Sequence, residues 1–226
     1  MMKLGIDEAG RGPVIGSMFV AGVLLDENSE ELLMKAGVRD SKLLTPNSRM
    51  KLLPLILKEA KFVAVIERKP WEVDSYNINK LFIESVVSIV KLTKGYGRTF
   101  DRVIVDSTSS RRELVNALIK EVGSNAEVIV EDRADRKYVV VAAASIVAKC
   151  FRDTHVKYLH LKYGDFGSGY PSDPKTIEWL KRFSGSNELP PIVRRSWRTL
   201  KRLGIRTSLG EEGILKWLKR RSNEGR

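Results

Sequence analysis

The sequence predicts an α/β fold: a mixed β-sheet flanked by helices and followed by a helical C-terminal appendage. Short apolar runs of strand length are interspersed with longer stretches of helical periodicity. Strands and helices alternate regularly only after the first three strands. A purely parallel sheet would show this alternation from its first strand, so a mixed sheet is predicted. The chain has 226 residues, of which 42% are hydrophobic. It can therefore bury a substantial core, and its length fits one domain plus an appendage.

The first half of the chain supplies three strands and two helices. Residues 3–6 form a short apolar strand, and residues 17–25 form a β-rich run. Helices are predicted over residues 30–36 and 46–60. Residues 62–68 alternate apolar residues with small or polar ones, which indicates a third strand.

The second half of the chain alternates helices and strands. Apolar residues recur at helical spacing over residues 79–94, and the Val-Ile-Val within residues 102–105 indicates a buried strand. A helix over residues 111–120 leads to a strand over residues 127–130. A long helix is expected over residues 142–163, and no internal repeat or low-complexity segment interrupts the pattern.

The basic charge is concentrated near the C-terminus. Residues 194–226 contain 11 Lys and Arg against 3 Asp and Glu, a net charge of +8 out of +12 for the whole chain. Apolar residues recur there at helical spacing in two groups: Trp197, Leu200 and Leu203, then Ile214, Leu215, Trp217 and Leu218. With Pro190-Pro191 marking the junction, we expect a main domain over residues 1–190 and a basic helical appendage over residues 191–226.

The appendage has two readings at this point, a phosphate-binding element and a solvated helix face without a ligand. An isoelectric point near 9.8 favours an acidic partner, of which nucleic acid is the commonest, although a basic proteome or the Lys-rich surface of a thermophile's protein gives the same value. If the appendage binds phosphates, deleting residues 194–226 should weaken substrate binding more than it lowers saturated turnover.

Composition excludes several classes of site. The single cysteine, Cys150, excludes an intramolecular disulfide and a cysteine zinc site. His155 and His160 do not share a helical face, which argues against a histidine metal site. The longest nearly apolar run, residues 139–148, is far shorter than the ~18 residues of a membrane span. No secretory signal is visible, so we expect a soluble, monomeric protein in the reducing cytoplasm.

Acidic residues follow three of the predicted strands: Asp7 and Glu8, then Asp106, then Asp135. Ligand sites of α/β sheets lie at the carboxyl ends of strands, so these side chains are candidates for one site. Each has an ordinary alternative, a solvated pair for Asp7 and Glu8 and a turn or helix cap for Asp106 and Asp135. Neighbouring strand residues point to opposite faces, so Asp7 and Glu8 can converge only if the strand bends or ends there.

Four converging carboxylates predict a site for divalent cations. Mg²⁺ prefers oxygen ligands, and clustered carboxylates repel one another strongly without a cation. Two ions about 4 Å apart can bind the attacking and leaving oxygens of a phosphodiester. A basic surface that collects phosphates beside such a centre is typical of a nuclease.

The glycines after Glu8 do not form a dinucleotide-binding fingerprint. Gly10, Gly12 and Gly16 have the wrong spacing for it, and a β-rich run follows them where a helix is needed. Small residues on both sides of Arg11 instead allow the backbone to approach a ligand closely. Peptide N–H groups there could hold a sugar hydroxyl or a phosphate.

Six motifs occur in a fixed order along nearly the whole chain. They are Asp7-Glu8-Ala9-Gly10-Arg11-Gly12-Pro13, Asp40-Ser41-Lys42-Leu43, Val105-Asp106-Ser107, Ala134-Asp135-x-Lys137-Tyr138, Ala143-Ala144-Ser145-Ile146-x-Ala148-Lys149 and Gly167-Ser168-Gly169-Tyr170-Pro171-Ser172-Asp173-Pro174. In this combination the chain resembles the type 2 ribonucleases H, and among them archaeal ribonuclease HII.

The resemblance implies a ribonuclease H-like fold and an endonuclease that acts on RNA paired with DNA or embedded in it. It implies that the catalytic metal ligands are four acids, Asp7, Glu8, Asp106 and Asp135, with two Mg²⁺ or Mn²⁺ ions as cofactors. Cleavage would fall on the 5′ side of a ribonucleotide in duplex DNA and leave 3′-hydroxyl and 5′-phosphate ends.

The resemblance also implies how substrate is bound. Gly10, Arg11 and Gly12 would recognise the ribose 2′-hydroxyl, and Tyr170 would stack on the neighbouring deoxyribose. Three further matched positions are expected to contact phosphates: Lys42, Ser145 and Lys149. The partners would be RNA–DNA hybrids and ribonucleotide-containing duplexes, not membranes. The motifs do not indicate whether a replication clamp is also a partner.

Two other functions are compatible with the charges alone. A non-catalytic nucleic-acid-binding protein needs only the basic appendage and a shaped surface. A metal-dependent phosphotransfer enzyme acting on small phosphate esters needs only the acids. Chelator-sensitive cleavage of a duplex with one ribonucleotide would eliminate the first, and comparison with a mononucleotide ester would separate the second.

Overall fold

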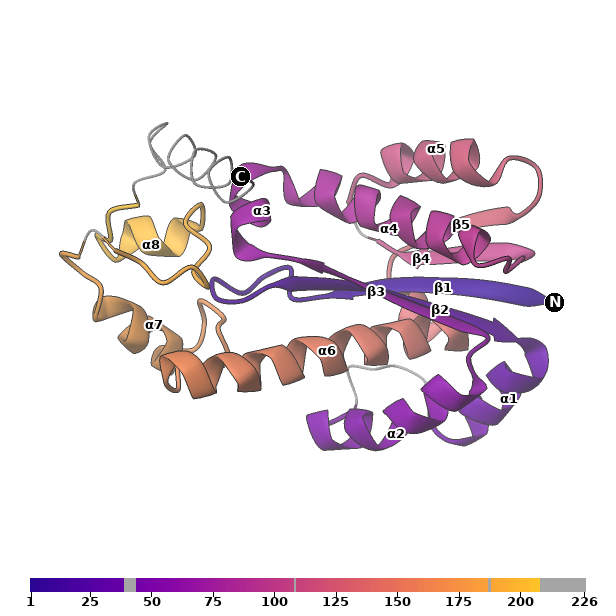
Figure 1. The fold of residues 1–226 in the computed structure, drawn as a ribbon, viewed down its shortest axis with the longest axis horizontal. Helices are drawn as coiled ribbons and strands as arrows, with labels where there is room; N and C mark the ends of the chain where they lie inside the picture. Colours follow the sequence, from indigo (N-terminus) through magenta and orange to yellow (C-terminus); the bar gives the residue numbers. More distant parts are fainter. Residues whose placement is uncertain (39–43, 108, 187, 208–226) are drawn as a thin grey trace, which may run out of the picture.

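The central element is a five-stranded mixed sheet with the strand order β3-β2-β1-β4-β5 (Figure 1). A computed structural model describes this fold for all residues except 39–43, 108, 187 and 208–226. The five predicted strands are all present: β1 (Met2–Ala9), β2 (Met18–Asp26), β3 (Phe62–Arg68), β4 (Arg102–Asp106) and β5 (Glu127–Glu131). β1, β2 and β3 are antiparallel neighbours, whereas β4 and β5 run parallel to β1.

Helices cover both faces of this sheet (Figure 1). α4 (Ile78–Gly95) and α5 (Arg111–Val122) lie on one face, where their apolar residues meet Leu4, Ile6 and Val105. The other face carries the long α6 (Val139–Tyr163), flanked by α1 (Glu27–Lys35) and α2 (Pro46–Glu59). Alternate residues of the strands thus enter two separate cores, as the period of two in a strand requires. The predicted α/β class is confirmed.

A third apolar cluster lies beyond the sheet, around the C-terminal end of α6. It includes Val14 and Ile15 of the loop after β1 together with residues of α7 (Pro174–Lys181) and α8 (Arg198–Arg202). α7 and the short α3 (Pro70–Ser75) were not predicted, because each spans only one or two turns and offers little periodicity. Proline stands in the first turn of both helices, where its missing N–H costs no hydrogen bond.

The described part of the predicted appendage packs against the main domain. Ile192, Val193, Leu200 and Ile205 are buried in the third cluster. The second predicted helical group, Ile214 to Leu218, lies outside the described residues. The division of the chain at residue 190 remains a prediction. Within the part of the chain described here, no helix is both long and apolar enough to cross a membrane.

Candidate active site

Three carboxylates meet where the parallel strands end. The register pairs Ile6 of β1 with Val105 of β4, so the next residues, Asp7 and Asp106, lie side by side. Asp135 lies on the short 3₁₀ helix η2 (Ala134–Arg136), which follows β5. Carboxylate oxygens of all three aspartates lie within 4.8 Å of one another. They line a cavity of about 210 Å³ together with Glu8, Ser107, Asp132 and Lys149.

β1 does not end at Asp7 and Glu8, which was one of the two ways in which the acids were expected to converge. β1 continues to Ala9, where it still pairs with Phe19 of β2. Its pairing with β4 stops at Ile6, however, because β4 ends at Asp106. The β4 side of the strand is therefore open at the two acids, and both line the same cavity although the strand continues.

Helix capping does not explain Asp106 or Asp135. The N-cap residues of α5 and α6 are Ser110 and Tyr138. The Asp106 carboxylate instead accepts hydrogen bonds from the backbone N–H groups of Arg133 (3.2 Å) and Asp135 (3.5 Å). Asp106 thereby fixes the turn that carries Asp135.

Burial and mutual repulsion raise the pKa values of two carboxyl groups of the cluster. Burial, and then the charges of Glu8 and Asp106, raise the pKa of Asp7 well above its usual range; a hydrogen bond from Ser145 and the charge of Lys149 oppose this. Burial, followed by the charge of Asp135, raises the pKa of Asp106 to about 6. A divalent cation would relieve this repulsion, and three carboxylates are the oxygen ligands that Mg²⁺ or Mn²⁺ takes. The residues present therefore fit a metal centre.

The loop after β1 has the geometry expected of a close backbone approach. Gly10 has a φ of 90°, and a Cβ there would lie 2.6 Å from the carbonyl oxygen of Ser17. A Cβ at Gly12 would lie 3.3 Å from the Tyr170 ring. Side chains larger than hydrogen would therefore move the loop or Tyr170.

The Arg11 side chain is held within the protein. Its Nε donates to Glu8 Oε1 (2.9 Å) and its Nη1 donates to Asn79 Oδ1 (2.7 Å), with the guanidinium 5.1 Å from the centre of the Phe82 ring. The Arg11 side chain therefore links Glu8 at the end of β1 to Asn79 of α4.

Sequence reasoning missed a residue that contacts Tyr170. Arg152 Nη1 donates to the Tyr170 hydroxyl (3.0 Å), and its Nε donates to Asp153 (2.7 Å). Arg152 is one helical turn beyond Lys149 on α6, so the row Ser145, Lys149 and Arg152 follows the spacing of one helix face. This spacing could have identified Arg152 from the sequence.

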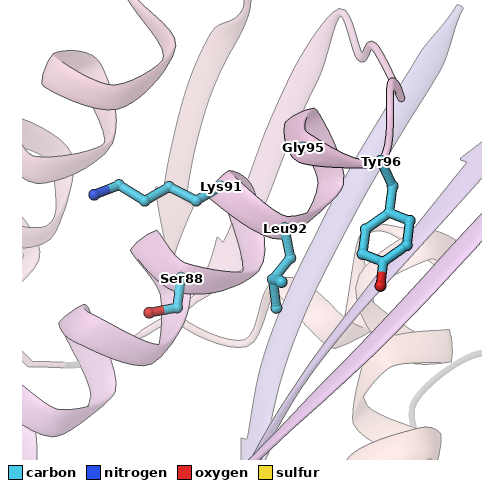
Figure 2. A pocket seen from close by; sticks show the side chains of 5 residues that line it. All are labelled: Ser88, Lys91, Leu92, Gly95 and Tyr96. Atoms are coloured by element: carbon cyan, nitrogen blue, oxygen red, sulfur yellow. The ribbon is translucent and has the colours of Figure 1, made fainter.

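The predicted site residues fall into three groups. The acidic cluster, with Ser145 and Lys149, lies at the carboxyl ends of the strands, and the glycine loop and Tyr170 lie next to each other beyond β1. Lys42 lies outside the described residues. A second hollow, of about 500 Å³, lies at the end of α4; Figure 2 shows its lining residues, Ser88, Lys91, Leu92, Gly95 and Tyr96. This hollow contains no carboxylate and lacks the chemistry of the acidic cavity.

Comparison with known proteins identifies the family. The sequence model for ribonuclease HII matches residues 4–200. The chain belongs to the ribonuclease HII family. Ribonuclease HII of Saccharolobus solfataricus is 39% identical over 217 residues, which cover 96% of this chain and 100% of that protein. Ribonuclease HII of Pyrococcus abyssi is 38% identical over 227 residues, covering 99% of this chain and all of the relative.

Solved structures of ribonuclease HII share this fold. The ribonuclease H2 of Pyrococcus horikoshii superposes with a TM-score of 0.81 at 38% identity and covers 90% of this chain and 97% of its own. The enzyme in the PCNA:RNase HII complex from Archaeoglobus fulgidus superposes with a TM-score of 0.79 at 38% identity, covering 91% and 98%. The protein is thus a ribonuclease H, a hydrolase of the ribonuclease HII type.

Proposed function

We propose that this ribonuclease HII cuts the RNA strand of RNA–DNA hybrids and cuts duplex DNA on the 5′ side of embedded ribonucleotides, leaving 3′-hydroxyl and 5′-phosphate ends. The observation that carries the proposal is the meeting of Asp7, Asp106 and Asp135 within 4.8 Å, beside the glycine loop and Tyr170. A non-catalytic binding protein has no use for carboxylates that repel one another in this way.

The acids have the role of holding divalent cations. We assign this role to Asp7, Asp106 and Asp135, with Glu8 at the edge of the same cavity. When bound, two Mg²⁺ or Mn²⁺ ions would activate a water and stabilise the departing 3′-oxygen. Ser145 and Lys149 on α6 favour the charged form of Asp7 and so oppose the rise in its pKa.

The remaining residues would select the substrate. Peptide N–H groups of Gly10, Arg11 and Gly12 bind the ribose 2′-hydroxyl, and this hydroxyl is what distinguishes RNA from DNA. A rigid polar site disfavours deoxyribose because its own groups are then left unpaired. Tyr170, oriented by Arg152, stacks on the next deoxyribose, so that the site reads an RNA–DNA junction. Lys42 and Lys149 are proposed as phosphate contacts. Ser145, also expected to be one from the sequence, is completely buried beside Asp7 and is not proposed as a phosphate contact.

Product mapping on a duplex with one ribonucleotide tests this function. We expect a single cut on the 5′ side of the ribonucleotide that requires Mg²⁺ or Mn²⁺ and stops with chelator. Asp106→Asn should lower kcat about 10³-fold, because the cluster loses an ionised ligand worth several kcal/mol in the transition state. Asp101→Asn, one residue before the start of β4 and therefore at the opposite end of the strand from Asp106, is the matched control and should cleave like the parent.

Three outcomes would contradict the proposal. Cleavage of an all-deoxy duplex at the same rate would remove the role of the 2′-hydroxyl. A folded Asp106→Asn variant with parental activity would remove the role of the acid. Faster hydrolysis of a mononucleotide ester than of the duplex would favour a phosphotransfer enzyme for small esters.

We propose a sliding clamp as a protein partner. The proposal rests on the Archaeoglobus fulgidus relative, which is 38% identical and whose structure is that of a PCNA:RNase HII complex. Size-exclusion chromatography of the full chain with the clamp of the same organism should yield a complex; separate elution at micromolar concentrations would contradict it.

A further inference from the structure

The C-terminal segment binds the carbonyl groups of the glycine loop, residues 10–16. The Arg194 guanidinium donates to three of them, in Gly10 (2.6 Å, from Nη2), Arg11 (3.0 Å, from Nη1) and Gly16 (2.8 Å, from Nε). The indole Nε1 of Trp197 donates to a fourth, the carbonyl of Gly12 (3.1 Å). One arginine and one tryptophan thus take four carbonyl groups of a seven-residue loop.

Arg194 is completely buried, with 0% of its surface exposed. The Trp197 ring covers the guanidinium, whose central carbon lies 4.9 Å from the ring centroid. Burial lowers the pKa of Arg194 to about 10, so the side chain remains charged at neutral pH. A buried cation is costly unless its donors are satisfied, and here carbonyl dipoles satisfy them. Arg194 therefore cannot serve as a phosphate contact on the surface.

The segment that carries Arg194 is fixed to the main domain on two sides. The backbone N–H of Arg194 donates to the carbonyl of Val14, and the N–H of Gly16 donates to the carbonyl of Ile192, both at 2.8 Å. On the other side, the Asp74 carboxylate of α3 accepts from the backbone N–H groups of the next two residues (2.7 and 2.9 Å). The guanidinium is therefore held at a defined position beneath the loop.

This arrangement determines where the loop amides point. The peptide bonds of the described chain are all trans, and in a planar trans peptide the carbonyl and the following N–H point in opposite directions. Because the carbonyls of Gly10 and Arg11 point toward the buried guanidinium, the N–H groups of Arg11 and Gly12 point away from it. These are amides of the loop to which we assign recognition of the ribose.

We propose that Arg194 is a positioning residue for ribose recognition: it binds the loop carbonyls and so turns the amides of Arg11 and Gly12 toward the 2′-hydroxyl, with Trp197 fixing Gly12. This inference rests on the proposed function. Arg194 touches neither substrate nor metal, so its effect is on discrimination between ribose and deoxyribose.

The test measures discrimination in the full chain. Cleavage of a duplex with one ribonucleotide gives KM, and the all-deoxy duplex of the same sequence, used as a competitive inhibitor, gives Ki. The ratio Ki/KM reports the contribution of the 2′-hydroxyl. Arg194→Lys retains the charge but cannot bind three carbonyls in a fork, so we expect Ki/KM to fall about tenfold. Ki and the affinity for Mn²⁺ alone should not change.

Two further variants complete the design. Trp197→Phe removes the indole N–H but keeps a ring over the guanidinium, and should lower Ki/KM about threefold. Arg102→Lys is the control, because Arg102 forms an ion pair with Glu127 at the opposite end of β4 from the acidic cluster. An unspecific effect of replacing arginine by lysine would change Ki/KM in the control as well. A role in positioning changes Ki/KM in Arg194→Lys and Trp197→Phe alone.

An unchanged Ki/KM in Arg194→Lys and Trp197→Phe would overturn the inference. If Arg194→Lys does not fold, Trp197→Phe decides, and an unchanged ratio again overturns it. If the parent protein does not cleave the ribonucleotide duplex, the proposed function fails and this inference fails with it; normal cleavage with unchanged ratios refutes the inference alone.

Discussion

Asp106 holds its proton more tightly than an ordinary carboxyl, because burial and the neighbouring charge of Asp135 raise its pKa to about 6. The pKa of Asp7 is raised by burial and by the charges of Glu8 and Asp106. In the metal-free protein below pH 6, a cation that binds between these groups must therefore displace at least one proton. Above pH 6 the Asp106 carboxylate is already ionised.

Below pH 6, we expect the affinity for Mn²⁺ to fall about tenfold per pH unit if binding displaces one proton, and more steeply if it displaces two. Isothermal titration calorimetry in two buffers of different ionisation enthalpy would measure both the affinity and the number of protons released. Asp106→Asn removes one of the titrating groups, so its affinity should be weaker and less dependent on pH. An affinity that does not change between pH 5 and pH 7 would contradict this prediction.

The contact between α6 and β1 is so close that one strand residue must lack a Cβ. A Cβ on Gly5 would lie 2.5 Å from both the carbonyl carbon and the oxygen of Val140, near the start of α6. The helix backbone cannot yield there without moving Ser145 and Lys149, which lie farther along the same helix. The packing of one helix on one strand thus sets the position of two residues near Asp7.

Gly5→Ala should lower the free energy of unfolding by about 1–3 kcal/mol, the usual cost of overpacking a core. Urea denaturation measures this change, and the affinity for Mn²⁺ should fall in the same variant because α6 shifts relative to Asp7. Gly95→Ala is the matched control: a Cβ on Gly95, at the end of α4, meets no atom within 4 Å. This control should be as stable as the parent or slightly more stable, and equal stabilities for both variants would contradict the prediction.

At the scale of the whole molecule, part of the C-terminal segment is built into the domain, whereas its charge suggested a separate basic element that binds phosphates. Arg194, Leu200 and Ile205 are buried in the third apolar cluster or beneath the glycine loop. Deletion of residues 194–226 is therefore expected to unfold part of the domain, and it cannot isolate an effect on substrate binding. The exposed basic residues of α8 test that effect better: Arg198, Lys201 and Arg202.

Replacing these three residues of α8 by Gln should weaken binding of a hybrid duplex while kcat stays unchanged. The plot of log affinity against log salt concentration should become shallower by about 0.9 for each phosphate contact that is lost. The matched control replaces three exposed basic residues by Gln: Lys91 and Lys94 in the last turns of α4, and Arg98 just after it. A salt dependence reduced equally in both triple variants would assign the effect to net charge and contradict a binding role for α8.

Local patterns in the chain were sufficient for the five strands and most helices. Periodicity depends on neighbours in sequence, and the ordered motifs placed Asp7, Glu8, Asp106 and Asp135 in one family's site before any geometry was known. The pattern predicted β1 too short, because the charges of Asp7 and Glu8 conceal a strand that continues to Ala9. The short helices α3 and α7 escaped detection because one or two turns give too little periodicity.

Only the folded chain reveals how residues far apart in sequence cooperate. The sequence around Arg194 is as basic as the sequence around the exposed Arg198. The carbonyl groups that accept the hydrogen bonds of the buried Arg194 guanidinium, however, belong to residues 10–16 at the other end of the chain. In the same way, the pKa of Asp106 depends on Asp135, which approaches it through the pairing of β4 with β5. Burial and electrostatic coupling are set by distances in space, and tertiary packing alone fixes these distances.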